Sequence, residues 1–385
     1  MTFTYETRTA KDGAVTYSKT ITTGRDPLTG KRRQKRLSAK TVRELKRLWA
    51  AELKRIEDGD YIEPSKTTFG EYLTHWLATY ARHNVRPTTY RSYEQLIRLH
   101  IAPALGAVPL QKLTPMQLQA FYADKLERGR LDGRPGGLSA RTVLPMHAVI
   151  REALQQALRW QLVAGNVADA VEPPRAKRAQ VAAWAPDDVT RFLDAADGDT
   201  YAPIWLVALA TGMRRGELLG LQWADIDLAR SELQVRRSLV EVDGKPVFQE
   251  PKTASGRRKV ALSAATVDAL RAHRTRQLER RLALGAAWRD LDLVFATADG
   301  GPIVPANLFR AFRRIVARAG VPPITFHALR HTHATLLLRE GIHAKIVSER
   351  LGHANIGITL DTYSHVLPDM QRDAADSIDR ALRGA

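Results

Sequence analysis

The segment TGMRRGE at residues 211–217 combines an arginine and a glutamate in a way that suits phosphate binding. Gly212 is expected to break a helix, so that Arg214 lies near the N-terminus of the next helix, where free backbone N–H groups favour anions. Glu217 follows three residues later on the same helical face and can hold the Arg214 guanidinium in place. An arginine fixed in this way is suited to bind two phosphate oxygens at once. Taken alone, the pattern also fits an ordinary surface ion pair.

A lysine that could act as an acid occurs in the segment KTASGR, residues 252–257, in the turn between two expected strands. On a tight turn, Lys252 can reach over a substrate and protonate a leaving oxygen, provided that nearby positive charge lowers its pKa. The alternative is a solvated lysine in a polar loop.

The segment HALRH at residues 327–331 is expected near the start of a helix. His327 and Arg330 are three residues apart and therefore project from one helical face, while Leu329 is free to pack in the core. Two cationic donors close to a helix start form a phosphate site. The alternative is a core histidine beside a surface arginine.

The last pattern is a histidine followed by a tyrosine: His353, after a helix break at Gly352, precedes Tyr363 by ten residues (363 minus 353). Tyr363 lies between a threonine and a serine, and a tyrosine in such polar surroundings raises the question of a role beyond packing. The alternative is a packing tyrosine whose hydroxyl is hydrogen-bonded.

Composition indicates a polyanionic partner. The chain has 385 residues and a formal net charge of +18 at pH 7, with the positive excess spread along its length. Nucleic acid is the leading candidate and an acidic membrane surface is the second. The absence of cysteine excludes disulfides, thiolate metal sites and cysteine nucleophiles. No signal peptide or membrane-spanning run is found, so we expect a cytoplasmic protein without a membrane partner.

The first 62 residues are short, polar and basic, and predict a small DNA-reading domain. Strands are expected at 3–5, 14–21 and 31–37, followed by a helix at 39–56 with apolar residues at helical spacing. The last strand carries a basic cluster that a three-stranded sheet could place against a DNA groove. The alternative is a solvated edge strand whose charges block aggregation. The cluster consists of Lys31, Arg32, Arg33, Lys35 and Arg36.

The rest of the chain predicts a helical domain followed by a mixed one. Helices are expected at 69–82, 88–99, 115–128 and 139–162, with Arg86, Arg91 and Arg141 as further candidate DNA contacts. Beyond a stiff basic linker at 173–178, the expected helices are 187–196, 201–219, 265–284, 305–319, 326–340, 345–351 and 359–363. Expected strands are 232–242, 246–249 and 257–262. The fold class is therefore multidomain α+β, with domains at 1–62, 63–175 and 176–385, the second all-α and the third mainly α with a small antiparallel sheet.

The order and spacing of these patterns resemble the tyrosine recombinase (phage integrase) family over residues 184–370. That family carries Arg, Lys, His-x-x-Arg, His or Trp, and Tyr in this order. The six places are filled by Arg214, Lys252, His327, Arg330, His353 and Tyr363, with no departure from the pattern. Residues 67–172 resemble the helical core-binding domain of the family. Residues 1–62, which contain the phrase DPLTGK at 26–31, resemble the arm-binding domain of larger integrases.

The resemblance implies a mechanism without metal, ATP or other cofactor. Tyr363 attacks the phosphorus and forms a 3′-phosphotyrosine link, with the 5′-hydroxyl as leaving group. Arg214, Arg330 and His353 stabilise the phosphoryl oxygens, Lys252 protonates the leaving oxygen and His327 helps to deprotonate Tyr363. Glu217 and His331 have supporting roles.

The resemblance also implies the partners. These are double-stranded DNA with core and arm attachment sites, a homotetramer on that DNA, and, as further candidates, a host DNA-bending protein and an excision or directionality factor. An amphipathic tail at 369–382 is expected to dock onto a neighbouring protomer. The gene would belong to a phage, an integrative conjugative element or a transposon, and the enzyme would act in the bacterial cytoplasm, at the nucleoid.

Three other interpretations stand beside this one. A type IB topoisomerase-like enzyme would use related chemistry to relax DNA, and a non-catalytic DNA-binding regulator would need none of it. A hydrolytic nuclease would need a metal constellation that the sequence does not show. A cluster of His331, His333 and His365 could in principle bind zinc, but the family order favours support or packing roles for these three residues.

Overall fold

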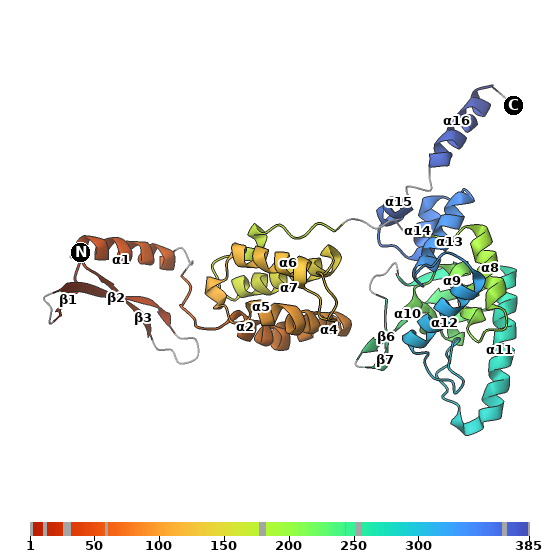
Figure 1. The fold of residues 1–385 in the computed structure, drawn as a ribbon, viewed down its shortest axis with the longest axis horizontal. Helices are drawn as coiled ribbons and strands as arrows, with labels where there is room; N and C mark the ends of the chain where they lie inside the picture. Colours follow the sequence, from red (N-terminus) through yellow and green to blue (C-terminus); the bar gives the residue numbers. More distant parts are fainter. Residues whose placement is uncertain are drawn as a thin grey trace. The chain divides into compact units, whose positions relative to one another are not determined.

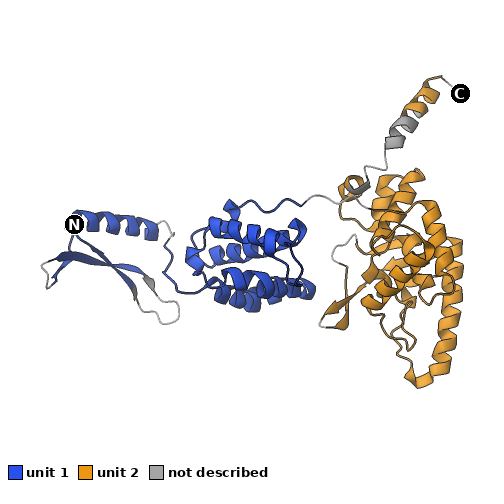
Figure 2. Cartoon of the chain, in the orientation of Figure 1, with its two compact units in different colours: residues 1–178 blue, residues 179–385 orange. Residues whose placement is uncertain are grey.

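The computed structural model describes residues 3–10, 14–25, 32–57, 61–176, 182–242, 244–251, 256–363 and 368–383. The chain divides into two compact units, residues 1–178 and 179–385 (Figure 2). None of the described helices is both long and apolar enough to cross a membrane.

The chain begins with a three-stranded antiparallel sheet and one helix packed on it (Figure 1). The strands are β1 Glu6–Thr9, β2 Val15–Arg25 and β3 Arg32–Ala39, and the helix is α1 Val42–Glu57. The prediction of a strand at residues 3–5 is wrong. The first strand lies directly before the turn, since Thr9 pairs with Val15, whereas Phe3 packs its ring edge-on against Trp49 of α1. Ile21, Leu37, Ala39 and Leu45 form a small core.

Residues 61–176 form the expected helical bundle. Its helices are α2 Phe69–Trp76, α3 Arg82–Asn84, α4 Pro87–Leu96, α5 Ala102–Leu105, α6 Pro115–Arg128 and α7 Ala140–Arg159, with short 3-10 turns at Leu110–Lys112 and Val167–Ala170. Five-residue π-helical segments, Leu77–Ala81 and Ile97–Ile101, replace the ends of the first two expected helices. The second segment precedes Pro103, which has no N–H to donate to the carbonyl four residues back. A separate core includes Tyr72, Trp76, Phe121 and Tyr122.

The second unit is mainly helical around an aromatic core. Its helices are α8 Pro186–Ala196, α9 Ala202–Thr211, α10 Arg215–Leu219, α11 Ala264–Leu284, α12 Pro305–Ala319, α13 Ala328–Arg339, α14 Ala344–Leu351, α15 Ile356–Tyr363 and α16 Pro368–Arg383, with 3-10 turns at Trp223–Asp225 and Gly285–Ala287. Trp184, Phe192, Trp205, Phe312 and Phe326 pack together at its centre.

The strands of the second unit form two separate sheets. One has the order β4 Ile226–Asp227, β5 Glu232–Val235, β8 Arg258–Ala261, and the other is the hairpin of β6 Ser238–Val242 with β7 Lys245–Gln249. The single strand expected at 232–242 is therefore wrong. The chain leaves the first sheet at Arg237, whose guanidinium turns to the buried carboxylate of Asp225 at 2.7 Å. The sheets are nevertheless small and antiparallel, and the predicted α+β fold class is confirmed.

Candidate active site

The Arg214 side chain is fixed at the junction of α9 and α10. Gly212 ends α9 in the left-handed region, with φ +63°, and Arg214 is the N-cap residue of α10. Its backbone N–H donates to Glu217 Oε2 at 2.9 Å, and its Nη1 donates to Glu217 Oε1 at 2.9 Å. The predicted helix break and the predicted Arg214–Glu217 pair are both confirmed.

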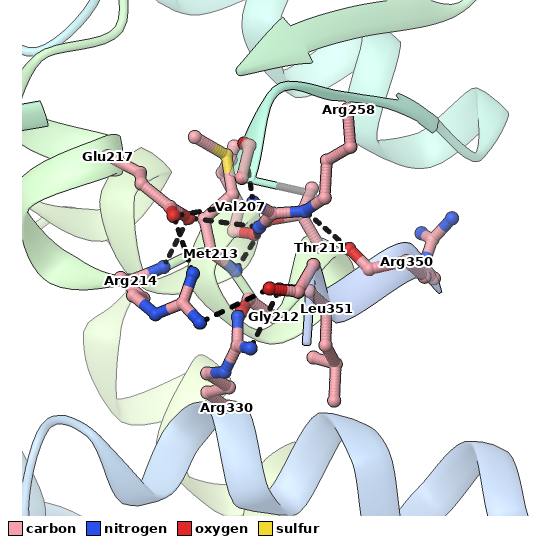
Figure 3. A network of polar contacts seen from close by, with 12 residues as sticks. Val207, Thr211, Gly212, Met213, Arg214, Glu217, Arg258, Arg330, Arg350 and Leu351 are labelled. Atoms are coloured by element: carbon pink, nitrogen blue, oxygen red, sulfur yellow. Dashed lines mark hydrogen bonds and ion pairs between the residues drawn. The ribbon is translucent and has the colours of Figure 1, made fainter. Parts of the chain in front are cut away.

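Glu217 is shared between two arginines (Figure 3). Arg258 of β8 donates through Nη2 to Glu217 Oε2 at 2.9 Å, and only 6% and 5% of the two side chains are exposed. Burial alone would raise the pKa of Glu217, but hydrogen bonds and positive charge from Arg258 and Arg214 lower it below its usual value. The carboxylate is therefore ionised at neutral pH and acts as a fixed anchor between the two guanidinium groups.

The carboxyl end of α14 accepts hydrogen bonds from three arginines at three consecutive carbonyls. The Arg350 carbonyl accepts from Arg258 Nε at 2.6 Å. The Leu351 carbonyl accepts from Arg330 Nη2 at 2.7 Å, and the Gly352 carbonyl from Arg214 Nη2 at 3.4 Å. The last carbonyls of a helix have no partner within it and lie at the negative end of its dipole, so cations bind there readily.

Arg330 also joins this helix end to that of α9. It rises from α13, as Figure 3 shows, and its Nη1 donates to the Gly212 carbonyl at 2.8 Å. Only 3% of the residue is exposed. Arg214 and Arg330, far apart in the sequence, are thus held at the same pair of helix ends.

Three histidines line the same cluster. His327 and His331 pack edge to face, with ring centroids 5.0 Å apart, and His353 Nδ1 lies 2.7 Å from Thr359 Oγ1. Burial, together with Arg330 and Arg214, lowers the pKa of His327 and brings that of His353 to about 4. Burial, followed by His327 and Arg330, lowers the pKa of His331 to about 4. His331 and His353 are therefore neutral at pH 7 and can accept a hydrogen bond or a proton.

His333 and Arg350, which are not among the eight predicted catalytic and supporting residues, connect the cluster to neighbouring backbone carbonyls. His333 Nδ1 lies 2.7 Å from the Leu209 carbonyl and must carry the hydrogen, because a carbonyl only accepts. His333 Nε2 then accepts from Arg350 Nε at 3.2 Å. Arg350 Nη2 in turn donates to the carbonyls of Ala210, at 2.9 Å, and Ala261, at 3.0 Å. The expectation that His333 has a support or packing role agrees with these contacts.

Six of the eight predicted catalytic and supporting residues meet in this cluster: Arg214, Glu217, His327, Arg330, His331 and His353. Lys252 lies outside the described residues, in the connection between β7 and β8. The backbone of Tyr363 ends α15, but its side chain is not described. Within the described residues, no group of three or more His, Asp or Glu could hold a metal ion.

The candidate DNA-binding residues of the first unit differ in their surroundings. Lys35 pairs with Glu52 of α1 at 2.6 Å, and Arg36 pairs with Glu6 at 2.7 Å. Lys31 lies outside the described residues, and the backbones of Arg32 and Arg33 lie on β3. In the helical bundle, Arg86 is half-buried, and Arg91 and Arg141 are exposed.

Two family models match the chain: the phage integrase family at residues 184–370 and the phage integrase N-terminal SAM-like domain at residues 68–126. A tyrosine recombinase XerC-like protein of Caldanaerobacter subterraneus subsp. tengcongensis is 30% identical over 97% of this chain and 98% of its own length. The ICEBs1 integrase of Bacillus subtilis is 26% identical over 95% of this chain and 97% of its own length.

The fold agrees with solved structures as well. An integrase of the transposon Tn1549, solved with transposon right end DNA, superposes with a TM-score of 0.68 at 22% identity. The match covers 81% of this chain and 99% of the other. The family-model matches and the tyrosine recombinase relative define an enzyme of the site-specific recombinase class. The chain belongs to the tyrosine recombinase, or phage integrase, family.

Proposed function

We propose that this recombinase cuts and rejoins DNA through Tyr363, integrating and excising a mobile element. The observation that supports this most directly is the fixed cluster of Arg214, Arg330 and His353 at the ends of α9 and α14. A phosphodiester carries negative charge that grows on its oxygens in the transition state, and preorganised cationic donors stabilise that charge.

The proposed chemistry is a transesterification that conserves one phosphoester bond. The Tyr363 oxygen attacks the scissile phosphorus and forms a 3′-phosphotyrosine, while the bond to the 5′ oxygen breaks. Lys252 gives a proton to that oxygen, and His327, whose pKa is lowered by burial, accepts the tyrosine proton. Because one ester replaces another, neither ATP nor a metal is part of the proposal.

We assign three domains to the chain, with boundaries at 1–62, 63–175 and 176–385. The separate apolar cores of residues 1–57 and 61–176 support this division, although the two parts belong to one compact unit. The first domain would bind arm sites and the other two would bind core sites, as a homotetramer acting in the cytoplasm. A host DNA-bending protein and an excision factor complete the proposed assembly.

The test is a cleavage assay with a suicide substrate, a nicked duplex that carries the attachment core of the element. Wild type should give a covalent protein–DNA band on a denaturing gel, with EDTA present, and Tyr363→Phe should give none, because it lacks the attacking oxygen. Tyr201→Phe is the matched control, since this tyrosine packs against Trp205 in the core. Its band should equal that of wild type.

An adduct from Tyr363→Phe would refute the assignment of the nucleophile. If wild type bound the verified site but formed no adduct, the protein would be a non-catalytic DNA-binding regulator.

A further inference from the structure

Arg258 is an arginine in a position where the sequence pattern calls for an apolar residue. In β8 its side chain shares a face with Val260, which is buried, while Lys259 between them is exposed. Arg258 itself is buried. A buried cation is costly unless it is paired and hydrogen-bonded, so its retention here needs a specific partner.

The Arg258 guanidinium donates hydrogen bonds to two separate partners, the Glu217 carboxylate and the Arg350 carbonyl. Nη2 and Nη1 donate to the two oxygens of Glu217, at 2.9 and 3.3 Å, and Nε donates to the Arg350 carbonyl at 2.6 Å. Glu217 holds Arg214, and the Arg350 carbonyl belongs to the helix end whose next two carbonyls hold Arg330 and Arg214. Besides Arg214 itself, Arg258 thus links the carboxylate to the helix end, and these two groups together position the two phosphate-binding arginines.

We propose that Arg258 is a positioning residue for strand cleavage, fixing Glu217 and the carboxyl end of α14 relative to each other so that Arg214 meets the scissile phosphate in one orientation. The inference rests on the proposed function, in which Arg214 binds that phosphate. Arg258 acts through Arg214 and the Leu351-Gly352-His353 turn.

The shape of the side chain explains why arginine is needed. Its planar fork presents donors on two edges, so that one group can satisfy a carboxylate on one side and a carbonyl on the other. A lysine in the same place carries the charge on a single nitrogen and would satisfy one partner well and the other poorly. Arg258→Lys therefore keeps the buried charge while loosening the link, and Arg258→Met removes both.

The experiment measures three properties of the full-length protein with its attachment-core duplex. These are the equilibrium affinity for the duplex, the single-turnover rate of adduct formation, and the same rate on a duplex with a methylphosphonate at the scissile position. The methylphosphonate removes the charge that the arginines stabilise, so that a misplaced Arg214 costs less there. Lys259→Met is the matched control, because it removes an adjacent cation whose side chain is exposed and pairs with Glu232 at 3.6 Å.

We expect Arg258→Met to bind the duplex within about threefold of wild type and to cleave it on the order of 10- to 100-fold more slowly, by analogy with the loss when a residue that orients a metal ligand is removed. Arg258→Lys should lie in between, and Lys259→Met should match wild type. On the methylphosphonate the rate difference between Arg258→Met and wild type should shrink at least threefold.

A merely structural role would lower the fraction of active protein and leave both the rate of that fraction and the methylphosphonate ratio unchanged, which would overturn the inference. If Arg258→Met does not fold, Arg258→Lys alone decides: a wild-type rate in that variant refutes the proposal. Absence of an adduct from wild type would instead refute the proposed function, so the two failures are distinguishable.

Discussion

At the scale of single residues, the site holds its histidines neutral in a strongly cationic environment. His333 shows the reason most clearly. Its Nδ1 donates a hydrogen bond to the Leu209 carbonyl, and its Nε2 accepts one from Arg350. Protonation would place a positive charge on Nε2 against the Arg350 guanidinium. Burial and this neighbour lower the pKa of His333 to about 4.

This arrangement predicts that the second unit loses stability in mild acid. The unfolded chain binds protons near the usual histidine pKa of 6.5, whereas folded His331, His333 and His353 bind them only near 4. Between these values the unfolded state carries more protons, so the free energy of unfolding falls as the pH is lowered through this window. Urea unfolding at a series of pH values measures the slope.

The variant His333→Gln isolates one histidine, because glutamine can donate and accept but does not titrate in this range. The dependence of its stability on pH should be weaker than that of wild type. Leu282→Gln is the control, since Leu282 is exposed and carries no titratable group, and its slope should equal that of wild type. Equal slopes for all three proteins would show that His333 does not titrate as described.

The sequence predicted the residues that the family pattern names, and Glu217 as the partner of Arg214, but it missed the other residues that hold them. Arg214, His327, Arg330 and His353 were found from order and spacing, and the structure brings them together. Arg258 is not among the residues that the family pattern names. Its signal was present, since an arginine in phase with Val260 on a strand points inward, but its partner Glu217 is 41 residues away in the chain.

At the scale of elements, the αL turn at Gly212 fixes the angle between α9 and α10. A Cβ at this position would lie 2.6 Å from His333 Cδ2 and 2.7 Å from Leu351 Cδ2. The turn therefore brings the α9 end close to α13 and α14, and leaves no room for a side chain.

Gly212→Ala is expected to lower both stability and the cleavage rate. A left-handed alanine costs roughly 1–2 kcal/mol, and displacement of the His333 ring adds to this cost and disturbs the Arg350 contact. Gly320→Ala is the matched control, because Gly320 ends α12 at φ +61° and a Cβ there meets nothing within 4 Å. Thermal unfolding should show the cost of the left-handed backbone alone at Gly320 and a larger loss at Gly212, and adduct formation should slow only at Gly212. Equal effects would mean that the contacts of Gly212 do not matter.

Helix positions were largely predictable from apolar spacing and capping signals, and strand pairing was not. The bounds of α6 and α12 agree with prediction to the residue. The sequence of β5 and β6 predicts one continuous strand, because no local signal indicates that Arg237 turns to the Asp225 carboxylate. β8 pairs with β5 although the β6–β7 hairpin lies between them in the sequence, and the local pattern does not determine such long-range pairing.

At the scale of the whole molecule, the net charge of +18 predicts strongly salt-dependent DNA binding. Each phosphate contact contributes about 0.9 to the slope of log affinity against log salt. The double change of Arg32 and Arg33 to glutamine should therefore lower the slope by up to about 2 on DNA with flanking arm sequence, and leave binding to a short core duplex unchanged.

The matched control is the double change of Arg43 and Arg47 to glutamine, two exposed arginines on α1 of the same domain. Fluorescence anisotropy titrations at several salt concentrations give both slopes. If the Arg32 and Arg33 change affects the short core duplex equally, the arm-binding assignment of this domain fails.

Helix α14, at the candidate active site, contacts the rest of the second unit through a small apolar cluster and through arginine hydrogen bonds. Ala334, Leu338, Val347 and Leu351 form an apolar cluster separate from the large aromatic core. The bonds from Arg258, Arg330 and Arg350 connect α14 to the strands and helices around that core. We therefore expect the segment that ends in Tyr363 to open as a local cooperative unit, with an equilibrium of its own, while the remainder stays folded. We expect changes that shift this equilibrium to alter how often Tyr363, the proposed nucleophile, is in place, without a matching change in the global melting temperature.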